Sequence, residues 1–117
     1  MRELIRISKA LSDETRIRML KLLAERDVCI CEMQEIFPLS ISQISRGLKI
    51  LMDAGFLARW REGKCVVYAA SNDSNINPFC RALLNTLAAS FNDDESVIKD
   101  RENLKRVIEA RIRELKK

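Results

Sequence analysis

Apolar residues recur at intervals of three and four near the start of the chain, which places them on one face of an α-helix. Residues 3–11, "ELIRISKAL", form the first predicted helix. Its apolar face consists of Leu4, Ile7 (or Ile5) and Leu11. Ser12 is expected to cap a second helix, because two acidic residues follow in a first turn that favours them. That helix should reach about residue 26 and bury Ile17, Leu20, Leu23 and Ala24.

A short third helix is predicted over residues 28–37, and "FPLS" ends it because proline disfavours a helical conformation in the residue before it. Ser40 opens the fourth helix, and Gln43, three residues on, completes a capping-box pattern. This helix should run to about Ala54, where Gly55 is suited to end it in a left-handed conformation. Its predicted core stripe consists of Ile41, Ile44, Leu48 and Leu51.

Two short segments rich in aromatic and β-branched residues, "FLARWR" and "KCVVYAA", predict a β-hairpin in which Gly63 takes a positive φ. Asn77 and Pro78 mark the start of a fifth helix. Its apolar residues are Phe79, Leu83, Leu84, Leu87 and Phe91. A charged final helix follows, with one apolar stripe made of Leu104, Ile108, Ile112 and Leu115. Such a stripe requires a partner, within the domain or in a second subunit.

The chain has 117 residues and neither an internal repeat nor a Gly/Ser-rich linker, so we expect one domain. Residues 93–117 are predicted to be a charged helix that extends the domain formed by residues 1–92. No apolar run approaches the roughly 20 residues needed to cross a bilayer, and charges interrupt the start too often for a signal peptide. We therefore expect a cytoplasmic protein with no membrane partner, whose four cysteines stay reduced.

Net charge is +4, and the surplus is concentrated in residues 40–68, which hold 5 basic and 2 acidic side chains. A basic surplus attracts polyanions. The predicted order of helix, turn, helix and hairpin is that of a winged helix-turn-helix, in which the second helix enters the major groove of DNA. The predicted fold class is therefore mainly α with a small β-hairpin, and residues 1–92 are expected to bind DNA and to dimerise.

Polar side chains on the fourth helix and the hairpin are of the types that contact DNA. Arginine pairs with guanine, glutamine pairs with adenine, and serine and lysine bind phosphate oxygens. The predicted DNA-binding residues are Ser40, Ser42, Gln43, Ser45, Arg46, Lys49, Arg59, Arg61 and Lys64. Each of these taken singly is more typical of a solvated helix face, and their combination with the capped helix, the preceding short helix and the basic hairpin favours DNA binding. Gly47 costs about 1 kcal/mol relative to alanine inside a helix, which suggests a close approach to DNA or to another helix.

The segments "LSDETRIRMLKLLAERDVCICEM" and "LSISQISRGLKILMDAGFLARWREGKCVVY" resemble the ArsR/SmtB family of metal- and metalloid-responsive repressors. Within that family, "VCICEM" resembles the arsenic-sensing branch. The resemblance covers about residues 5–70. It implies a homodimer, paired largely through its first and fifth helices, that blocks transcription by binding double-stranded operator DNA. A thiophilic effector then lowers the affinity for DNA.

The sequence departs from the pattern of this family at several places. Arsenic sensors of this branch often have Cys-x-Cys-x-x-Cys, and Gln34 occupies the third position here. Gly47 stands where helix four commonly has histidine. No cysteine precedes residue 29, so the cadmium and lead arrangement that uses N-terminal thiols of the other subunit is not available. The zinc site that some relatives build on helix five needs histidine, which this chain lacks.

Cys29 and Cys31 are the predicted effector ligands, because thiolates select soft acceptors such as trivalent arsenic or antimony. Residues two apart on a regular helix point to nearly opposite sides, so this pair converges only if the helix start is extended or distorted. A trigonal arsenite site needs a third thiolate, for which Cys80 and Cys65 are the candidates, whereas a methylated or aryl arsenical needs only two. The structural alternative is that Cys29 and Cys31 are small buried apolar residues, with Cys65 an ordinary strand residue and Cys80 part of a helix core.

The resulting prediction is a homodimeric winged-helix repressor of an arsenic-resistance operon, released by inorganic or organic trivalent arsenic or antimony. Two alternatives keep the fold and change the effector: a thiol redox or persulfide switch, or a sensor of cadmium, lead or copper. An enzyme is disfavoured, because no histidine is present to act as a general base and no cofactor loop is evident. No enzymatic cofactor is therefore expected.

Overall fold

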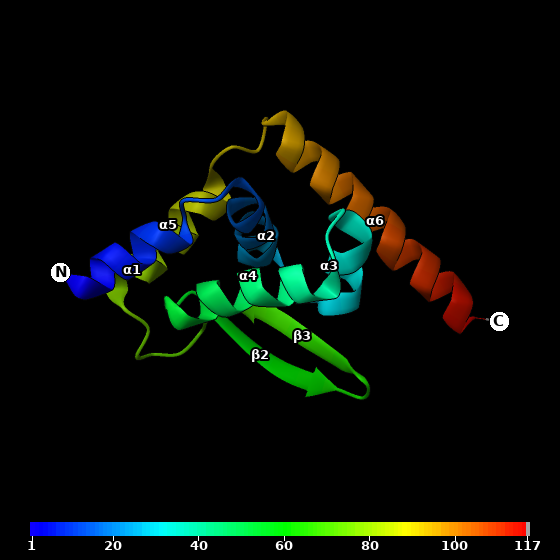
Figure 1. Ribbon diagram of the computed structural model, residues 1–117. Helices are drawn as coiled ribbons and strands as arrows, with labels where there is room; N and C mark the ends of the chain where they lie inside the picture. Colours follow the sequence, from blue (N-terminus) through cyan, green and yellow to red (C-terminus); the bar gives the residue numbers. More distant parts are fainter. Residues whose placement is uncertain (117) are drawn as a thin grey trace.

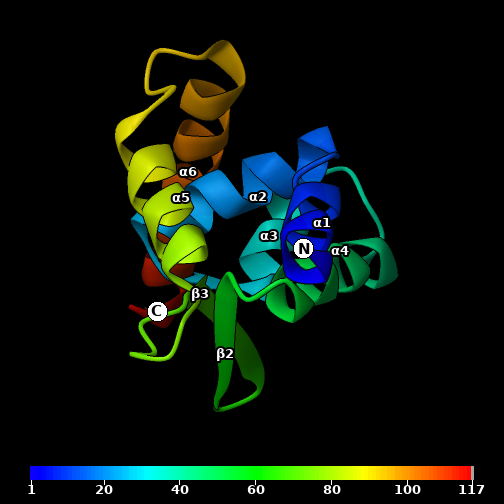
Figure 2. The same ribbon diagram turned by 90° about the vertical axis from the view of Figure 1, so that its left-hand side faces the viewer.

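The computed structural model describes residues 1–116 as six helices and a three-stranded antiparallel sheet (Figure 1). The elements in chain order are α1 (Arg2–Ala10), α2 (Glu14–Glu25), β1 (Val28–Cys29), α3 (Ile30–Ile36), α4 (Ile41–Asp53), β2 (Leu57–Glu62), β3 (Cys65–Ala70), α5 (Pro78–Ala89) and α6 (Glu95–Leu115). The predicted class, mainly α with a hairpin, is confirmed. The β2–β3 hairpin extends beyond the helices in both views (Figures 1 and 2).

The start of α2 differs from the prediction by one residue. Asp13, not Ser12, is the N-cap, and its Oδ2 accepts a hydrogen bond from the backbone N–H of Arg16 at 3.0 Å. The hydroxyl of Ser12 donates instead to the carbonyl of Lys9 at 2.7 Å, at the end of α1. A carboxylate both accepts the capping hydrogen bond and places negative charge at the positive end of the helix, so aspartate serves here as well as serine.

The prediction of a helix over residues 28–37 is wrong in its first two residues. Val28 and Cys29 form β1, which pairs with β3 through Val28 opposite Tyr68 and Cys29 opposite Val67. The strand order is β1-β3-β2, so β3 is the central strand. A two-residue strand is too short to show an alternating pattern, and its partner on β3 determines that it forms.

The turns around α4 and the hairpin follow the prediction, and the packing explains Gly47. Gly55 after α4 has φ +97° and Gly63 in the hairpin turn has φ +59°, both in the left-handed region that favours glycine. A β-carbon at position 47 would lie 2.9 Å from Met19 Cε on α2. Gly47 therefore permits the close packing of α2 on α4, so the close approach expected at this glycine is to another helix.

Several predicted apolar faces extend further than the buried core. The exposed members are Leu4, Ile17, Ile41, Phe79, Phe91, Ile112 and Leu115. Most of them lie at helix ends, where no neighbouring element covers them. Phe91 lies beyond the end of α5 with φ +61°, and the last turns of α6 continue past α3 (Figure 1). Lys117, the last residue of the predicted C-terminal helix, lies outside the described residues.

The core is centred on α2, which contacts α4, α5, α6 and β3. Burying a large apolar side chain contributes roughly 1.5–3 kcal/mol. The largest fully buried side chains include Tyr68, Phe37, Phe56, Met19 and Met33. None of the helices within residues 1–116 has both the length and the apolar composition that crossing a membrane requires.

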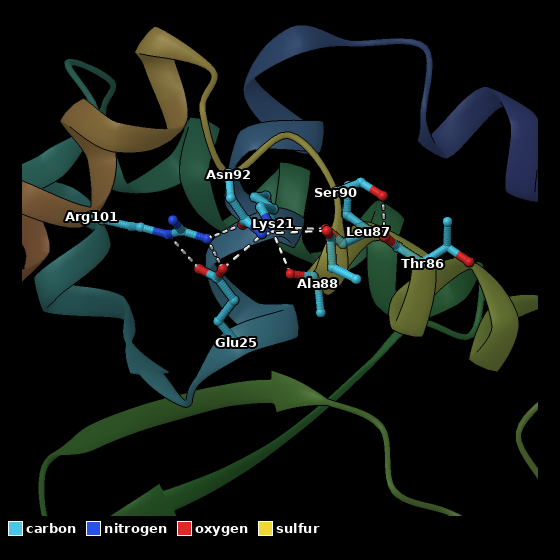
Figure 3. A network of polar contacts seen from close by, with 9 residues as sticks. Lys21, Glu25, Thr86, Leu87, Ala88, Ser90, Asn92 and Arg101 are labelled. Carbon is cyan, nitrogen blue, oxygen red and sulfur yellow. Dashed lines mark hydrogen bonds and ion pairs between the residues drawn. The ribbon is translucent and has the colours of Figure 1, made fainter.

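Lys21 is a charged residue in the middle of this central helix, and only 2% of it is exposed. Its Nζ donates to the carbonyls of Leu87 and Ala88 at 2.8 and 3.0 Å and to Oδ1 of Asn92 at 2.9 Å (Figure 3). Oε1 of Glu25 lies 3.2 Å from the same Nζ. The two carbonyls are at the C-terminal end of α5, where a helix leaves acceptors unpaired and favours positive charge. Lys21 therefore caps α5 and fixes it to α2.

Two ion pairs hold α6 on α2. Arg18 donates from Nε and Nη2 to the carboxylate of Asp100 at 2.9 and 2.7 Å, and Asp100 is only 1% exposed. Arg101 pairs with Glu25, next to the Lys21 network (Figure 3). Burial acts to raise the pKa of Glu25, but hydrogen bonds from Arg101 and Lys21 outweigh it and lower this pKa overall. The first half of α6 is therefore part of the folded body.

We expect Lys21→Met to lower the free energy of unfolding by roughly 2–4 kcal/mol, because it leaves the acceptors at the end of α5 without their buried donor. Urea denaturation followed by circular dichroism measures this difference. Lys49→Met is the matched control, because the Lys49 side chain is 72% exposed and pairs with Asp53 at the surface. That change should cost less than about 1 kcal/mol. Equal losses in the two variants would show that the buried network does not stabilise the fold.

Candidate functional site

Three cysteine side chains from two separate parts of the chain meet at one point. The sulfur atoms of Cys29, Cys31 and Cys65 all lie within 4.8 Å of one another. Sγ of Cys31 is 2.6 Å from Sγ of Cys29 and 3.7 Å from Sγ of Cys65. Cys29 is buried and the other two are half-buried, so the cluster is accessible to a small solute. We refer to these three residues as the thiol cluster.

The local fold explains how the Cys-x-Cys pair converges. Cys29 is the N-cap of α3 and has an extended backbone, with φ −75° and ψ 144°. Its side chain therefore leaves the chain before the helix begins and turns toward Cys31, which meets the geometric condition derived from the sequence. Cys29 faces Val67 across the β1–β3 ladder, and Cys65 lies two residues before Val67 on β3, where side chains two apart share a face. The ladder thus places Cys65 beside the first turn of α3.

Glu32 closes the cluster on the side of α6. Its Oε1 accepts a hydrogen bond from the backbone N–H of Cys29 at 2.8 Å, which caps α3. Its Oε2 lies 3.2 Å from Nη1 of Arg111, and α6 packs against α3 along this contact. Burial acts to lower the pKa of Arg111, but electrostatic attraction to Cys31, Glu32, Cys29 and Cys65 in their ionised forms outweighs it and raises this pKa overall. Glu32 therefore links the guanidinium of Arg111 on α6 to the backbone of Cys29 in the thiol cluster.

The two thiols of the Cys-x-Cys pair differ in acidity. Burial acts to raise the pKa of Cys29, but hydrogen bonds from Cys31 and other neighbours outweigh it and lower this pKa overall. Burial, followed by hydrogen bonding with Cys29 and Cys65, raises the pKa of Cys31 to about 12. The first thiolate to form in the cluster is therefore Cys29, with Cys31 as its hydrogen-bond donor. A thiolate is the form that attacks soft ions and electrophiles, so Cys29 is the side chain that would start capture.

Three sulfur donors form a soft ligand set of low coordination number. Sulfur ligands select arsenic(III), antimony(III), lead, cadmium or copper(I), whereas hard cations such as magnesium and calcium require oxygen ligands. The residues present therefore fit a thiophilic metal or metalloid.

Cys80, the other candidate for a third ligand, lies apart from the thiol cluster. It is fully buried at the start of α5, and its Sγ donates to the carbonyl of Ala54 at 3.5 Å. Burial, together with the charge of Glu3, raises the pKa of the Cys80 thiol. Of the two residues considered from the sequence, the fold brings Cys65 to the Cys-x-Cys pair and holds Cys80 in the core.

The residues predicted to contact DNA lie on two surfaces, the outer face of α4 and the hairpin. The exposed ones are Ser40, Ser42, Gln43, Arg46, Lys49, Arg59, Arg61 and Lys64, and Ser45 is half-buried. Ile41, Ser42, Ser45, Arg46 and Lys49 line a shallow hollow of about 450 Å³ on α4. Both surfaces are therefore open to a large partner.

Two of these residues also start α4. Oγ of Ser40 accepts from the backbone N–H of Gln43 at 3.2 Å, and Oε1 of Gln43 accepts from the backbone N–H of Ser40 at 2.9 Å. This confirms the predicted capping box. The cap occupies the side-chain oxygen that Gln43 would offer to an adenine amino group. While the cap is intact, one lone pair of this oxygen is used, and the second lone pair and the amide N–H groups remain available for a base edge.

Two residues near the candidate sites were not predicted from the sequence: one on the hairpin and one near the thiol cluster. Trp60 lies on β2, is 39% exposed, and donates from Nε1 to Glu62 at 2.9 Å. Its position between two arginines of a predicted wing strand was a usable signal. Arg111 lies on α6, far along the chain from the cysteines, and no local pattern indicates that it reaches the thiol cluster.

Comparison with known proteins gives one consistent family. Residues 13–59 match the family described as bacterial regulatory protein, arsR family. The arsenic resistance transcriptional regulator ArsR1 of Pseudomonas putida is 42% identical over 72 residues, which are 58% of this chain and 56% of that protein. The arsenical resistance operon repressor of Bacillus subtilis is 36% identical over 70 residues, 59% of this chain and 66% of that protein. A homologue of the cadmium resistance transcriptional regulatory protein CadC in Staphylococcus aureus is 31% identical over 72 residues, 61% of this chain and 60% of that protein. The match thus spans between about half and two thirds of the length of these relatives.

Solved structures share the fold. Rv0081 of Mycobacterium tuberculosis superposes with a TM-score of 0.55 at 29% identity and covers 91% of this chain and 89% of that chain. The homodimeric winged helix-turn-helix DNA-binding domain Mb0332 of Mycobacterium bovis superposes with a TM-score of 0.61 at 21% identity, covering 74% of this chain and 76% of that chain. The chain therefore has a winged helix-turn-helix fold, as predicted.

We expect serine at position 29, 31 or 65 to weaken cadmium binding by at least 10- to 100-fold, because each change removes a sulfur donor. Loss of a residue that only hydrogen-bonds to a metal ligand already lowers the metal affinity by about this factor. Titration of the sulfur-to-cadmium charge-transfer absorption measures the affinity. Cys80→Ser is the matched control and should change the affinity by less than about twofold, since Cys80 donates to a core carbonyl. A loss with Cys80→Ser equal to that with Cys65→Ser would place the third ligand elsewhere.

Proposed function

We propose that this chain, which belongs to the ArsR family of bacterial regulatory proteins, is a transcriptional repressor that leaves its operator when a thiophilic effector binds the thiol cluster. The proposed effectors are trivalent arsenic and antimony, in inorganic or organic form. The convergence of Cys29, Cys31 and Cys65 is the observation that carries this proposal. The fold brings three sulfur donors together, whereas in the sequence only Cys29 and Cys31 lie close to each other.

Arsenic(III) satisfies the chemistry of such a cluster without a change of oxidation state. Arsenious acid carries three hydroxyl groups, and each thiol replaces one of them, so three As–S bonds form and three molecules of water leave. The Cys29 thiolate attacks first, the two remaining thiols give their protons to two of the departing hydroxyl groups, and solvent supplies the proton for the third. An aryl arsenical with two hydroxyl groups requires only two thiols, and the close Cys29–Cys31 pair supplies them.

DNA binding is assigned to α4 and the hairpin. In a winged helix-turn-helix the second helix of the pair enters the major groove, and here α4 is that helix and α3 precedes it. Arg46 and Lys49 project from its exposed face, while Arg59, Arg61 and Lys64 line the hairpin. The hairpin residues are positioned for the phosphate backbone, which supplies sequence-independent affinity.

The position of Cys65 links the effector to the hairpin directly. Cys65 pairs with Glu62 across the hairpin and follows Lys64 in the turn. An ion held by all three sulfurs joins the turn end of β3 to the first turn of α3, and α3 packs against α4. Small movements of the sulfurs toward an ion therefore act on both proposed DNA-contacting surfaces. A change in the relative position of α4 and the hairpin lowers DNA affinity, because both must fit the duplex at once.

A homodimer is part of the proposal. Leu4 and Ile5 on α1 and Phe79 on α5 are exposed apolar side chains, and pairing of these helices in two subunits would cover them. Two copies of α4 would then read two half-sites about one turn of DNA apart.

An oxidant is a second candidate effector, because Sγ of Cys29 lies 2.6 Å from Sγ of Cys31 and the two thiols differ in acidity. A hydroperoxide would oxidise the pair to a disulfide, take up two electrons and leave as an alcohol and water. Cadmium, lead and copper(I) remain candidates within the same ligand set, and one relative is named for cadmium resistance.

We expect arsenite and phenylarsine oxide to weaken binding to the DNA upstream of the protein's own gene by about 5- to 150-fold, the usual range of coupling between two sites. Fluorescence anisotropy with a labelled duplex measures it. Zinc should act less, because it prefers four ligands. Cys31→Ser should bind the duplex and no longer release it with arsenite, whereas Cys80→Ser should respond normally. Unchanged DNA binding with every effector would end the effector proposal, and release by peroxide alone would favour the redox candidate.

Arg46→Ala and Lys64→Ala should affect DNA binding differently. Loss of a base contact at Arg46 should cost about 1–3 kcal/mol and relax the preference at one base pair, whereas loss of a phosphate contact at Lys64 should weaken all sequences alike and reduce the salt slope by about 1. Binding to the operator and to a scrambled duplex over a range of salt concentrations separates the two. Lys99→Ala, an exposed lysine on α6, is the control for loss of one positive charge. An equal loss in all three variants would show that only net charge matters.

A further inference from the structure

The Glu32–Arg111 ion pair lies directly behind the thiol cluster, and no sequence motif or family match accounts for it. Oε2 of Glu32 is 3.2 Å from Nη1 of Arg111, and Oε1 of the same carboxylate holds the backbone N–H of Cys29 at 2.8 Å. Only 11% of the Glu32 side chain is exposed. One carboxylate therefore joins the N-cap of α3 to α6 next to the sulfur atoms, where α6 packs against α3 (Figure 1).

The ions that this ligand set accepts differ in the charge of their complexes. Arsenic(III) bound to three thiolates is neutral, because three negative sulfurs balance a trivalent centre. Cadmium or lead bound to the same three thiolates carries one negative charge, and three protons are released to solvent. The energy of each complex therefore responds differently to nearby charge, and any fixed charge beside the cluster contributes to the choice of ion.

We infer that the Glu32–Arg111 pair sets the charge selectivity of the thiol cluster, with Arg111 as the counter-ion of a divalent complex. This inference rests on the proposed function, because it requires an ion to bind the three thiols. Arg111 is a positioning and charge-balancing residue and not a ligand. Without Arg111, the Glu32 carboxylate that holds the N–H of Cys29 loses its cationic partner, and its charge then disfavours a complex that carries a negative charge and hardly changes a neutral one.

The test compares cadmium and arsenite affinities in the full-length chain, measured from their sulfur charge-transfer absorption with a chelator and a competing dithiol. Arg111→Gln should weaken cadmium binding by about 3- to 10-fold, an estimate reduced for the 46% exposure of the Arg111 side chain. Arsenite binding should change by less than about twofold, since its complex is neutral. The ratio of cadmium affinity to arsenite affinity, compared between the wild type and the variant, tests the inference.

Two further variants separate charge from structure. Glu32→Gln keeps an oxygen acceptor for the Cys29 N–H, because glutamine also forms a capping box, and removes the negative charge. It should raise the cadmium-to-arsenite affinity ratio, and the double variant Glu32→Gln/Arg111→Gln should return it close to that of the wild type. Arg113→Gln is the matched control, because residues two apart on α6 point to nearly opposite sides. It should leave the ratio unchanged.

Sodium nitrate supplies an independent readout, because salt screens a charge effect and does not screen a packing defect. The effect of Arg111→Gln on cadmium should shrink as nitrate is raised. Equal losses of cadmium and arsenite affinity in Arg111→Gln, or an unchanged ratio in all variants, would overturn the inference while leaving the effector proposal standing. Failure of the wild-type chain to bind either ion through its cysteines would overturn both.

Discussion

The pairing of β1 with β3 is the constraint on which the candidate site depends. Two residues, Val28 and Cys29, add a third strand to the hairpin and fix its register. That register brings Cys65 to the Cys-x-Cys pair, from which it is separated by 34 positions along the chain. The same short strand keeps Cys29 extended, so its side chain turns toward Cys31 before α3 begins. A regular helix over the motif would have separated the two sulfurs, and a free hairpin would have left Cys65 without a fixed position.

The charged residues of the interior make α6 part of the same body. Arg18 with Asp100 and Arg101 with Glu25 join it to α2, and Arg111 with Glu32 joins it to α3. Lys21 ties α5 to the same central helix. Buried pairs of this kind add little net stability compared with apolar packing, but they tolerate few alternative arrangements, because a displaced partner leaves a charge in the core. The thiol cluster therefore lies against a surface of defined geometry and charge.

Family membership and site chemistry answer different questions. The family match covers residues 13–59, from the start of α2 to the start of β2, and is to the arsR family of bacterial regulatory proteins. Relatives named for arsenic and for cadmium resistance match over similar lengths, so the family alone does not identify the effector. Three sulfur ligands favour soft ions as the proposed effector. The charges of Glu32 and Arg111 are proposed to favour one soft ion over another.

Elements with local signals could be predicted from the amino-acid sequence: the capped helix α4, the hairpin with glycine in its turn, the Asn-Pro start of α5 and the winged helix-turn-helix order. These follow from side chains acting on their own backbone or on residues within one turn. The sequence also singled out Cys29 and Cys31 because they are neighbours. Three features depend on packing between distant segments: the existence of β1, the position of Cys65 beside this pair while Cys80 stays in the core, and the ion pair of Arg111 with Glu32. Each of those depends on contacts between segments far apart in the chain, and no periodicity or cap within a single segment records which distant segment it will meet.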